Sequence, residues 1–133
     1  MLPTSATPKV AIAVLNYNGW RNTLECLESL KKLDYPDHQM IVIDNKSTDD
    51  SSVQITTWLK QNWPQAHFIQ SPNNRGYAAG NNQGIRWALG QGFDYIWILN
   101  DDTVAQPDTL NRLVAKAQAE PTAGLVGAMQ YYY

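Results

Sequence analysis

The sequence has a single cysteine, no long apolar run and no marked excess of either charge. Cys26 cannot form an internal disulfide, and residues 1–8 lack the basic and apolar segments of a secretion signal. We therefore expect a cytoplasmic protein, with a peripheral position at the inner face of the membrane as an alternative. No stretch approaches the roughly 18–20 apolar residues that cross a bilayer, so no transmembrane segment is expected in this chain.

A basic surface stripe is also absent, since 10 Lys and Arg stand against 12 Asp and Glu. Nucleic acid is therefore not an expected partner, because nonspecific binding to its phosphates needs such a stripe. No G-x-G-x-x-G follows the first apolar run, and G-x-x-x-x-G-K-[ST] does not occur. These two absences argue against dinucleotide oxidoreductases and P-loop NTPases.

What is present, after a lead-in at residues 1–8, is an alternation of short apolar runs with segments of helical periodicity. The apolar runs predict strands at 10–15, 40–43, 66–70, 95–99 and 124–130. The helices expected between them cover 20–33, 53–63, the surroundings of 85–89 and 107–120. This order predicts one α/β domain over residues 9–133, a Rossmann-like three-layer sandwich with a mainly parallel sheet.

Polar residues follow each of the first four predicted strands. Because ligands bind at the carboxyl ends of the strands in such sheets, the clusters are candidates for one common crevice. The alternative for each cluster alone is a turn or a helix cap, which Asn, Asp and Ser also favour. The clusters are Asn16 and Asn18, Asp44 and Asn45, Asn74 and Arg75, and Asn100 to Asp102.

Asp101 and Asp102 are adjacent acids directly after an apolar strand. Two neighbouring carboxylates repel each other unless solvent, a cation or a hydrogen-bond donor compensates. Oxygen ligands suit Mg or Mn, which commonly take one or two protein carboxylates together with substrate phosphates. The pair therefore predicts a divalent metal site, with a solvated surface pair as the alternative.

Asp44 and the glycine-rich stretch after residue 73 each allow two interpretations. The Asp44 carboxylate can accept a hydrogen bond from a ring N–H such as that of uracil, or it can accept one from the backbone before the second helix. Gly80 and Gly84 permit close approach of a ligand or close packing of a helix on the sheet. For these two glycines the packing interpretation is preferred.

Four stretches together resemble the N-terminal half of family 2 glycosyltransferases with the GT-A fold. They are VLNYN at 14–18, IDNKSTD at 43–49, NRGYAAGNNQGI at 74–85 and LNDDT at 99–103. The similarity spans about residues 9–133, and the asparagine-rich third stretch is most similar to the rhamnosyltransferase-like branch. The last stretch matches the D-x-D motif of the family, with Asn100 in place of its first Asp.

The resemblance implies a nucleotide-diphosphate sugar donor, a UDP- or dTDP-sugar, and a glycan or lipid-linked acceptor in cell-wall or polysaccharide biosynthesis. It implies inverting, metal-dependent transfer of a hexosyl or rhamnosyl group, with Asp44 reading the base, Asp101 near the ribose and Asp102 as metal ligand. Mg or Mn would neutralise charge on the departing diphosphate. The substrate-binding residues implied are Asn16, Tyr17, Asn18, Asp44, Asn45, Arg75, Gly76, Asn81 and Asp101, and the metal ligands are Asp102 and Asp101.

The resemblance also implies that the general base comes from a second, acceptor-binding half beyond residue 133. We therefore expect a truncated fragment that binds donor and metal, is inactive alone, and self-associates through apolar surface that later elements would cover. One alternative is a sugar-phosphate nucleotidyltransferase, which should carry a Gly-rich basic loop that residues 16–19 do not supply. The other is a noncatalytic nucleotide-binding or assembly module.

Overall fold

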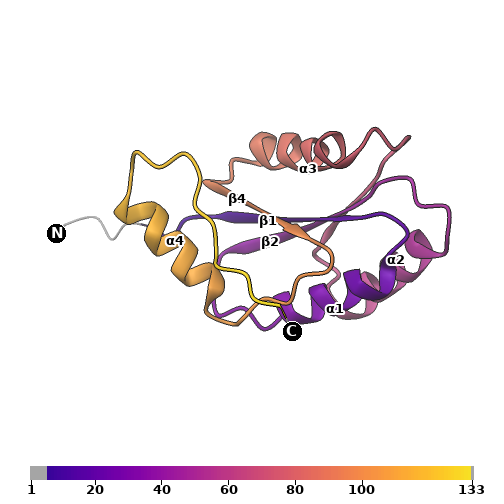
Figure 1. The fold of residues 1–133 in the computed structure, drawn as a ribbon, viewed down its shortest axis with the longest axis horizontal. Helices are drawn as coiled ribbons and strands as arrows, with labels where there is room; N and C mark the ends of the chain where they lie inside the picture. The colour runs from indigo at the N-terminus through magenta and orange to yellow at the C-terminus, as the bar shows by residue number, and fades with distance from the viewer. Residues whose placement is uncertain (1–5, 133) are drawn as a thin grey trace.

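The computed structural model describes residues 6–132, which form alternating strands and helices (Figure 1). Residues 1–5 of the predicted lead-in and Tyr133 lie outside the described residues, and residues 6–9 form neither helix nor strand. The elements in chain order are β1 (Val10–Asn16), α1 (Trp20–Leu30), β2 (His38–Asp44), α2 (Ser51–Asn62), β3 (His67–Gln70), α3 (Tyr77–Gln91), β4 (Tyr95–Asn100) and α4 (Thr109–Ala119).

The strands form a four-stranded sheet in the order β3-β2-β1-β4, and every neighbouring pair is parallel. All seven residues of β1 are buried, because this strand is covered on both faces and has a neighbour on each side. Its apolar sequence is what such a position requires. The predicted α/β architecture with a parallel sheet is therefore confirmed.

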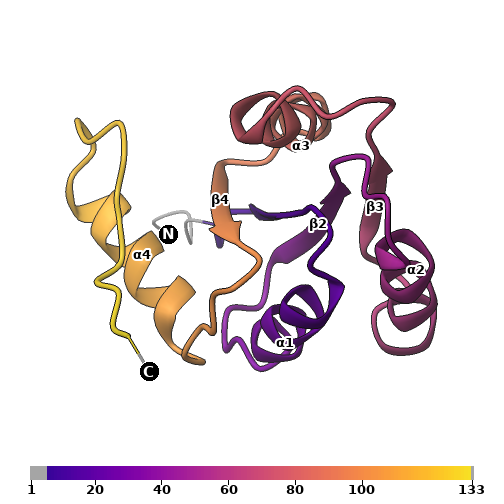
Figure 2. The same cartoon turned by 45° about the vertical axis from the view of Figure 1, so that its right-hand side comes forward.

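Helices cover both faces of the sheet, which gives three layers (Figure 2). On one face, α1, α2 and α4 contribute Leu27, Ile55 and Leu110 to a core with alternate residues of the strands. On the other face, α3 packs alone against a smaller core that includes Ala13 and Ile43. The two faces thus divide the apolar side chains of each strand between them, as the alternation of a strand dictates.

The helix α3 approaches the sheet closely at two glycines. A Cβ atom at Gly80 would lie 2.7 Å from Leu15 Cδ1, and one at Gly84 would lie 3.0 Å from Ile43 Cδ1. The packing interpretation of both glycines is confirmed. Gly92 ends the helix with a φ of 76°, the left-handed conformation that favours glycine at a helix C-terminus.

Three predictions about the second half of the chain were wrong. No strand forms at 124–130; Leu125 there is 97% exposed, and a strand needs a neighbour to pair with its backbone. Instead the segment runs back alongside α4 (Figures 1 and 2). The apolar run at 95–99 is typical of a buried central strand, but β4 is an edge strand among the described residues and pairs only with β1. Pro107 lies in the turn before α4, whose N-cap is Asp108.

The chain offers no candidate for a membrane crossing among residues 6–132, since none of its helices combines the necessary length and hydropathy.

Candidate functional site

The carboxyl ends of β1, β2 and β4 meet at one edge of the sheet. Asn16 is the register partner of Asp44 on β2, and Leu15 is the partner of Asn100 on β4. Since adjacent parallel strands lie about 4.8 Å apart, the polar residues that follow them are neighbours. The convergence of these three predicted clusters is a geometric fact of the fold.

Asn16 and Asp44 form the buried centre of this edge. Asn16 Nδ2 donates to Asp44 Oδ1 at 2.8 Å and to Ser47 Oγ at 3.1 Å. Asn16 Oδ1 accepts from the Thr23 hydroxyl at 2.8 Å. Asn16 therefore joins the start of α1 to the loop after β2, and its amide has partners at both ends.

The second carboxylate oxygen of Asp44 is also engaged within the fold. Asp44 Oδ2 accepts from the Ser47 backbone N–H at 3.1 Å and from Gln70 Nε2 at 2.7 Å. The Ser47 contact is the backbone acceptor role weighed above for this residue. Because Asp44 is fully buried, these donors replace the water that an ionised carboxylate would otherwise need.

Asn18 links the loop after β1 to the loop after β2 through hydrogen bonds. Asn18 Oδ1 accepts from the backbone N–H of Thr48 at 2.7 Å and of Asp49 at 3.2 Å, and the backbone N–H of Asn18 donates to Ser47 Oγ at 2.9 Å. Asn18 and Lys46 both have positive φ, 51° and 62°. Such left-handed residues are uncommon outside glycine and persist where surrounding contacts hold them.

The two adjacent acids lie in the turn that follows β4, closed by a hydrogen bond from the Thr103 N–H to the Asn100 carbonyl. Asp101 is half-buried and its Oδ2 accepts from the Thr23 hydroxyl at 3.3 Å. Burial raises the pKa of Asp101, the Thr23 hydrogen bond opposes this, and the charge of Asp102 adds to the rise. Asp102 is exposed, and its carboxylate makes no hydrogen bond to any described residue.

The start of α3 closes the site from the opposite face of the sheet. Asn45 Nδ2 donates to Asn74 Oδ1 at 3.1 Å and to the Gly76 carbonyl at 3.3 Å. Gly76 has a φ of 93°, so the turn into α3 needs a residue without Cβ. Arg75 is exposed beside it, whereas Asn81 is buried and donates to the Tyr77 carbonyl.

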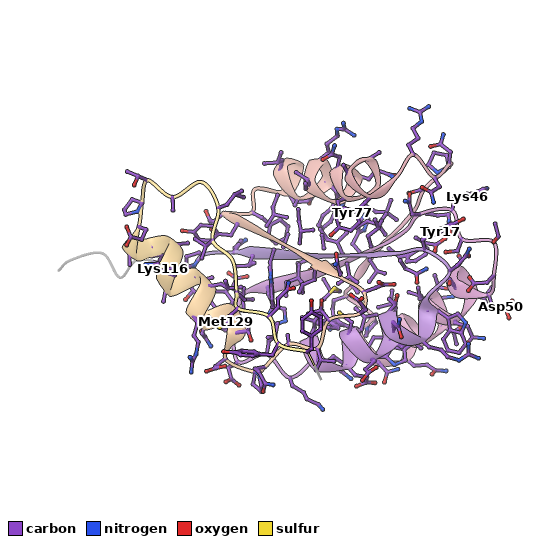
Figure 3. All side chains as sticks on the ribbon, viewed as in Figure 1. Tyr17, Lys46, Asp50, Tyr77, Lys116 and Met129 are labelled. Atoms are coloured by element: carbon purple, nitrogen blue, oxygen red, sulfur yellow. The ribbon has the colours of Figure 1, made fainter. Side chains whose placement is uncertain are left out.

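A cavity of about 260 Å³ lies between these elements and is lined by Leu15, Tyr17, Tyr77 and the three residues Asn100, Asp101 and Asp102. Figure 3 labels Tyr17, Lys46 and Tyr77 on the same side of the molecule, far from Lys116 and Met129 on α4 and the segment after it. Of the predicted site residues, only Tyr17, Asp101 and Asp102 line this cavity. Asn16 and Asp44 are buried among hydrogen-bond partners instead. Asn45 and Asn81 are also buried; their Nδ2 atoms donate hydrogen bonds, whereas their Oδ1 atoms have no partner among the described residues.

Four residues of the site were not predicted from the sequence. Thr23, Ser47 and Gln70 hold the buried network, and Tyr77 lines the cavity. Ser47 and Tyr77 lie within the stretches 43–49 and 74–85, but a hydroxyl or amide group gives no sequence signal of its hydrogen-bond partner. Gln70 is 26 residues from Asp44, and Tyr77 is 23 residues from Asn100.

The donor set fits a hard divalent ion bound together with a ligand. Within the described part of the chain, no three His, Cys, Asp or Glu side chains gather closely enough to hold a metal by themselves. Mg and Mn need no such cage, since one or two carboxylates and the oxygens of a bound phosphate suffice. Asp102, exposed at the cavity, and the half-buried Asp101 supply that number.

Comparison with known proteins gives consistent results. Residues 11–133 match the family described as glycosyl transferase family 2. The chain is 26% identical over 123 residues to the glycosyltransferase GlyG of Streptococcus pneumoniae, covering 92% of this chain and 39% of that protein. It is 28% identical over 110 residues to the poly-beta-1,6-N-acetyl-D-glucosamine synthase of Staphylococcus epidermidis, covering 83% of this chain and 26% of that protein. The chain thus spans well under half the length of these relatives.

Solved structures share the fold. The mannosyltransferase PcManGT from Pyrobaculum calidifontis, in complex with GDP-Man and Mn²⁺, superposes with a TM-score of 0.80 at 27% identity over 90% of this chain and 35% of that one. S. aureus TarS 1–349 in complex with UDP-GlcNAc gives a TM-score of 0.73 at 21% identity over 92% of this chain and 37% of that one. Both neighbours are GT-A glycosyltransferases, so the expected fold class is confirmed.

Proposed function

This chain belongs to glycosyl transferase family 2, and from that premise we propose that it is the donor-binding part of an inverting, metal-dependent enzyme. In this proposal the enzyme transfers a hexosyl or rhamnosyl group from a nucleotide-diphosphate sugar to a glycan or lipid-linked acceptor. The observation that carries it is the exposed Asp102 carboxylate, which has no hydrogen bond among the described residues and lines the cavity at the ends of β1 and β4.

The proposed roles follow from which groups at the sheet edge face the cavity. Asp102, assisted by Asp101, would hold Mg or Mn, and Tyr17 lines the wall beside them. When bound, the metal supplies a Lewis acid that offsets negative charge developing on the departing nucleoside diphosphate. Asn16 and Asp44 would support the loops that follow β1 and β2. Contact of Asp44 with a nucleotide base would require one of its carboxylate oxygens to accept a further hydrogen bond, from the ligand.

We place the general base outside these residues. Of the ionisable groups that line the cavity in the described chain, the only carboxylates are Asp101 and Asp102, and no imidazole is present. If both hold the metal, neither is free to take a proton from the acceptor hydroxyl, which requires a positioned group of its own. Donor binding without transfer by the 133-residue chain is the corresponding expectation.

Isothermal titration calorimetry with UDP, dTDP and GDP, each with Mn²⁺ and with EDTA, tests the proposal. GDP is included because PcManGT was solved with GDP-Man. We expect one nucleotide to bind in a manganese-dependent way, and Asp102→Ala to abolish that binding while the chain stays folded. Asp34→Ala is the matched control, because Asp34 is exposed after α1 and away from the cavity. Equal affinity in the Asp102→Ala chain would return Asp102 to the ordinary surface acids.

A further inference from the structure

The acidic turn is tied to the helix on the far side of the sheet by one side-chain contact. The Tyr77 hydroxyl donates to Asn100 Oδ1 at 2.6 Å, which joins the first residue of α3 to the last residue of β4. Both side chains line the cavity, and Tyr77 is 54% exposed. The Tyr77 phenol is thus fixed by a short hydrogen bond although about half of the residue is exposed in the cavity.

The same turn is held from the other face of the sheet by α1. Thr23 donates to Asp101 Oδ2 at 3.3 Å, and the Cys26 thiol donates to the Asn100 carbonyl at 3.8 Å. Three contacts from two helices therefore hold residues 100 and 101 in place. The Asp102 side chain makes no hydrogen bond to any described residue, so its direction depends on how firmly the rest of the turn is held.

The backbone at Tyr77 is held in place by contacts on both sides of this residue. Its carbonyl accepts from Asn81 Nδ2 at 3.2 Å, and three residues further along, Gly80 lies against Leu15 and Asn45. The turn before it is held by Asn45, which donates to the Gly76 carbonyl. The start of α3 is thus a fixed support from which the phenol reaches β4.

The direction of the hydrogen bond also decides what Asn100 offers to a ligand. Because Oδ1 accepts from the phenol, the two N–H donors of the amide are at the other end, and Nδ2 has no partner among the described residues. An amide donor beside two carboxylates gives a phosphate group an attractive contact where a third carboxylate would repel it. Asn100 carries that donor into the cavity that Asp101 and Asp102 share.

We propose that Tyr77 is a positioning residue of the diphosphate site: its hydroxyl orients the Asn100 amide so that Nδ2 donates to a phosphate oxygen of the nucleotide, and it steadies the turn that carries Asp102. This inference rests on the proposed function and deepens it. It assigns Asn100 a contact with phosphate and Tyr77 an action through Asn100. Tyr77 itself need not touch the ligand.

The test is a mutant cycle in the 133-residue chain, read by calorimetry with Mn²⁺ and the nucleoside diphosphate that the unaltered chain binds most tightly. Tyr77→Phe removes only the hydroxyl, and we expect it to weaken affinity about three- to tenfold, the value of one net hydrogen bond. Asn100→Ala should weaken it at least as much. The double variant should be no weaker than Asn100→Ala, because the phenol acts through the amide.

Two further measurements separate positioning from a general effect on folding. The thermal midpoint of Tyr77→Phe should equal that of Tyr132→Phe, a control at a fully exposed tyrosine outside the cavity. In ¹⁵N NMR spectra the side-chain amide signals of Asn100 should shift on nucleotide addition to the unaltered chain, and should start from a different position in Tyr77→Phe.

The outcomes distinguish this inference from the function on which it rests. Should the unaltered chain bind no nucleoside diphosphate, the proposed function and the role of Tyr77 both fail. If it binds, but Tyr77→Phe binds equally well or its loss adds fully to that of Asn100→Ala, the role of Tyr77 alone is overturned.

Discussion

Asp44 and Asp102 follow parallel strands at the same edge of the sheet, yet they have opposite surroundings. Asp44 is fully buried, and its two oxygens accept from Asn16, Ser47 and Gln70. Asp102 is exposed at the cavity and makes no hydrogen bond to a described residue. A strand end thus delivers a carboxylate either to the interior, where it links loops, or to the surface, where its oxygens have no partner among the described residues. The donors within reach decide which.

Asp101 is intermediate between these two acids and shows how the regions are joined. Its Oδ2 lies 3.3 Å from the Thr23 hydroxyl oxygen, and Asn16 Oδ1 lies 2.8 Å from the same oxygen, so the two acceptors share one hydroxyl proton. One threonine of α1 therefore connects the buried network to the acidic turn. Because burial raises the pKa of Asp101, keeping this carboxylate ionised costs free energy.

The largest expected effect comes from removing the buried acid. Asp44→Ala leaves Asn16 Nδ2, Gln70 Nε2 and the Ser47 N–H without their acceptor in the interior, so we expect a loss of about 3 kcal/mol of unfolding free energy. Urea denaturation followed by circular dichroism measures it. Asp102→Ala should change the same free energy by less than about 0.5 kcal/mol. Equal losses in the two variants would remove the distinction between these acids.

The next effect tests the close packing of α3 on the sheet at Gly80, beside Asn45, the residue that follows the buried Asp44. A methyl group at Gly80 would meet Leu15 Cδ1 at 2.7 Å and Asn45 Cγ at 3.2 Å, so Gly80→Ala should destabilise the chain by about 2 kcal/mol. Gly90, in the same helix, has no atom within 4 Å of the corresponding position. Gly90→Ala should therefore stabilise the chain by about 0.5 kcal/mol. Thermal melts of both variants measure the difference in sign.

The smallest effect concerns the buried thiol of Cys26, which lies near the acidic turn. Burial raises the pKa of this thiol from 9.0 to about 12, and the charges of Asp101 and Asp102 contribute to the rise. Below pH 9 both folded and unfolded chains keep the proton. Above it the unfolded chain alone loses the proton, so stability falls as pH rises, by about 1.4 kcal/mol at pH 10.

Unfolding free energies at pH 8 and pH 10, compared with those of Cys26→Ala, isolate this contribution from other groups that titrate in alkali. The loss between the two pH values should be larger in the unaltered chain. An equal loss in both chains would mean that the thiol is not shielded as its burial indicates.

Much of the fold could be predicted because burial on two faces leaves a plain pattern. The apolar runs at 10–15 and 40–43 lie within β1 and β2. Gly90 and Gly92 are both typical of a helix end, and α3 continues through Gly90 and ends before Gly92. The same rule failed at 124–130, since an apolar run shows that a segment could be covered but not that a strand lies beside it. Ile98 in β4 is 41% exposed for a related reason, because edge or centre is set by the partner.

The convergence of polar residues at one edge of the sheet could be predicted, but their different surroundings could not. Sequence order brings Asn16, Asp44 and Asp102 to this edge, yet nothing in the residue types distinguishes the buried Asp44 from the exposed Asp102. Tyr77 was missed because its partner Asn100 is 23 residues away, on the other side of a helix. A hydrogen bond between layers of a sandwich leaves no periodic trace in the sequence.

The hydrogen bonds by which Asn18 links the two loops have a thermodynamic consequence. Its side chain already fixes the backbone after β2, so under the proposed function a nucleotide would meet loops whose ordering entropy was lost during folding. Little further ordering remains to oppose association, and more of the contact energy can appear as affinity. Removing these inter-loop hydrogen bonds would therefore make binding entropically less favourable without removing any contact to the ligand.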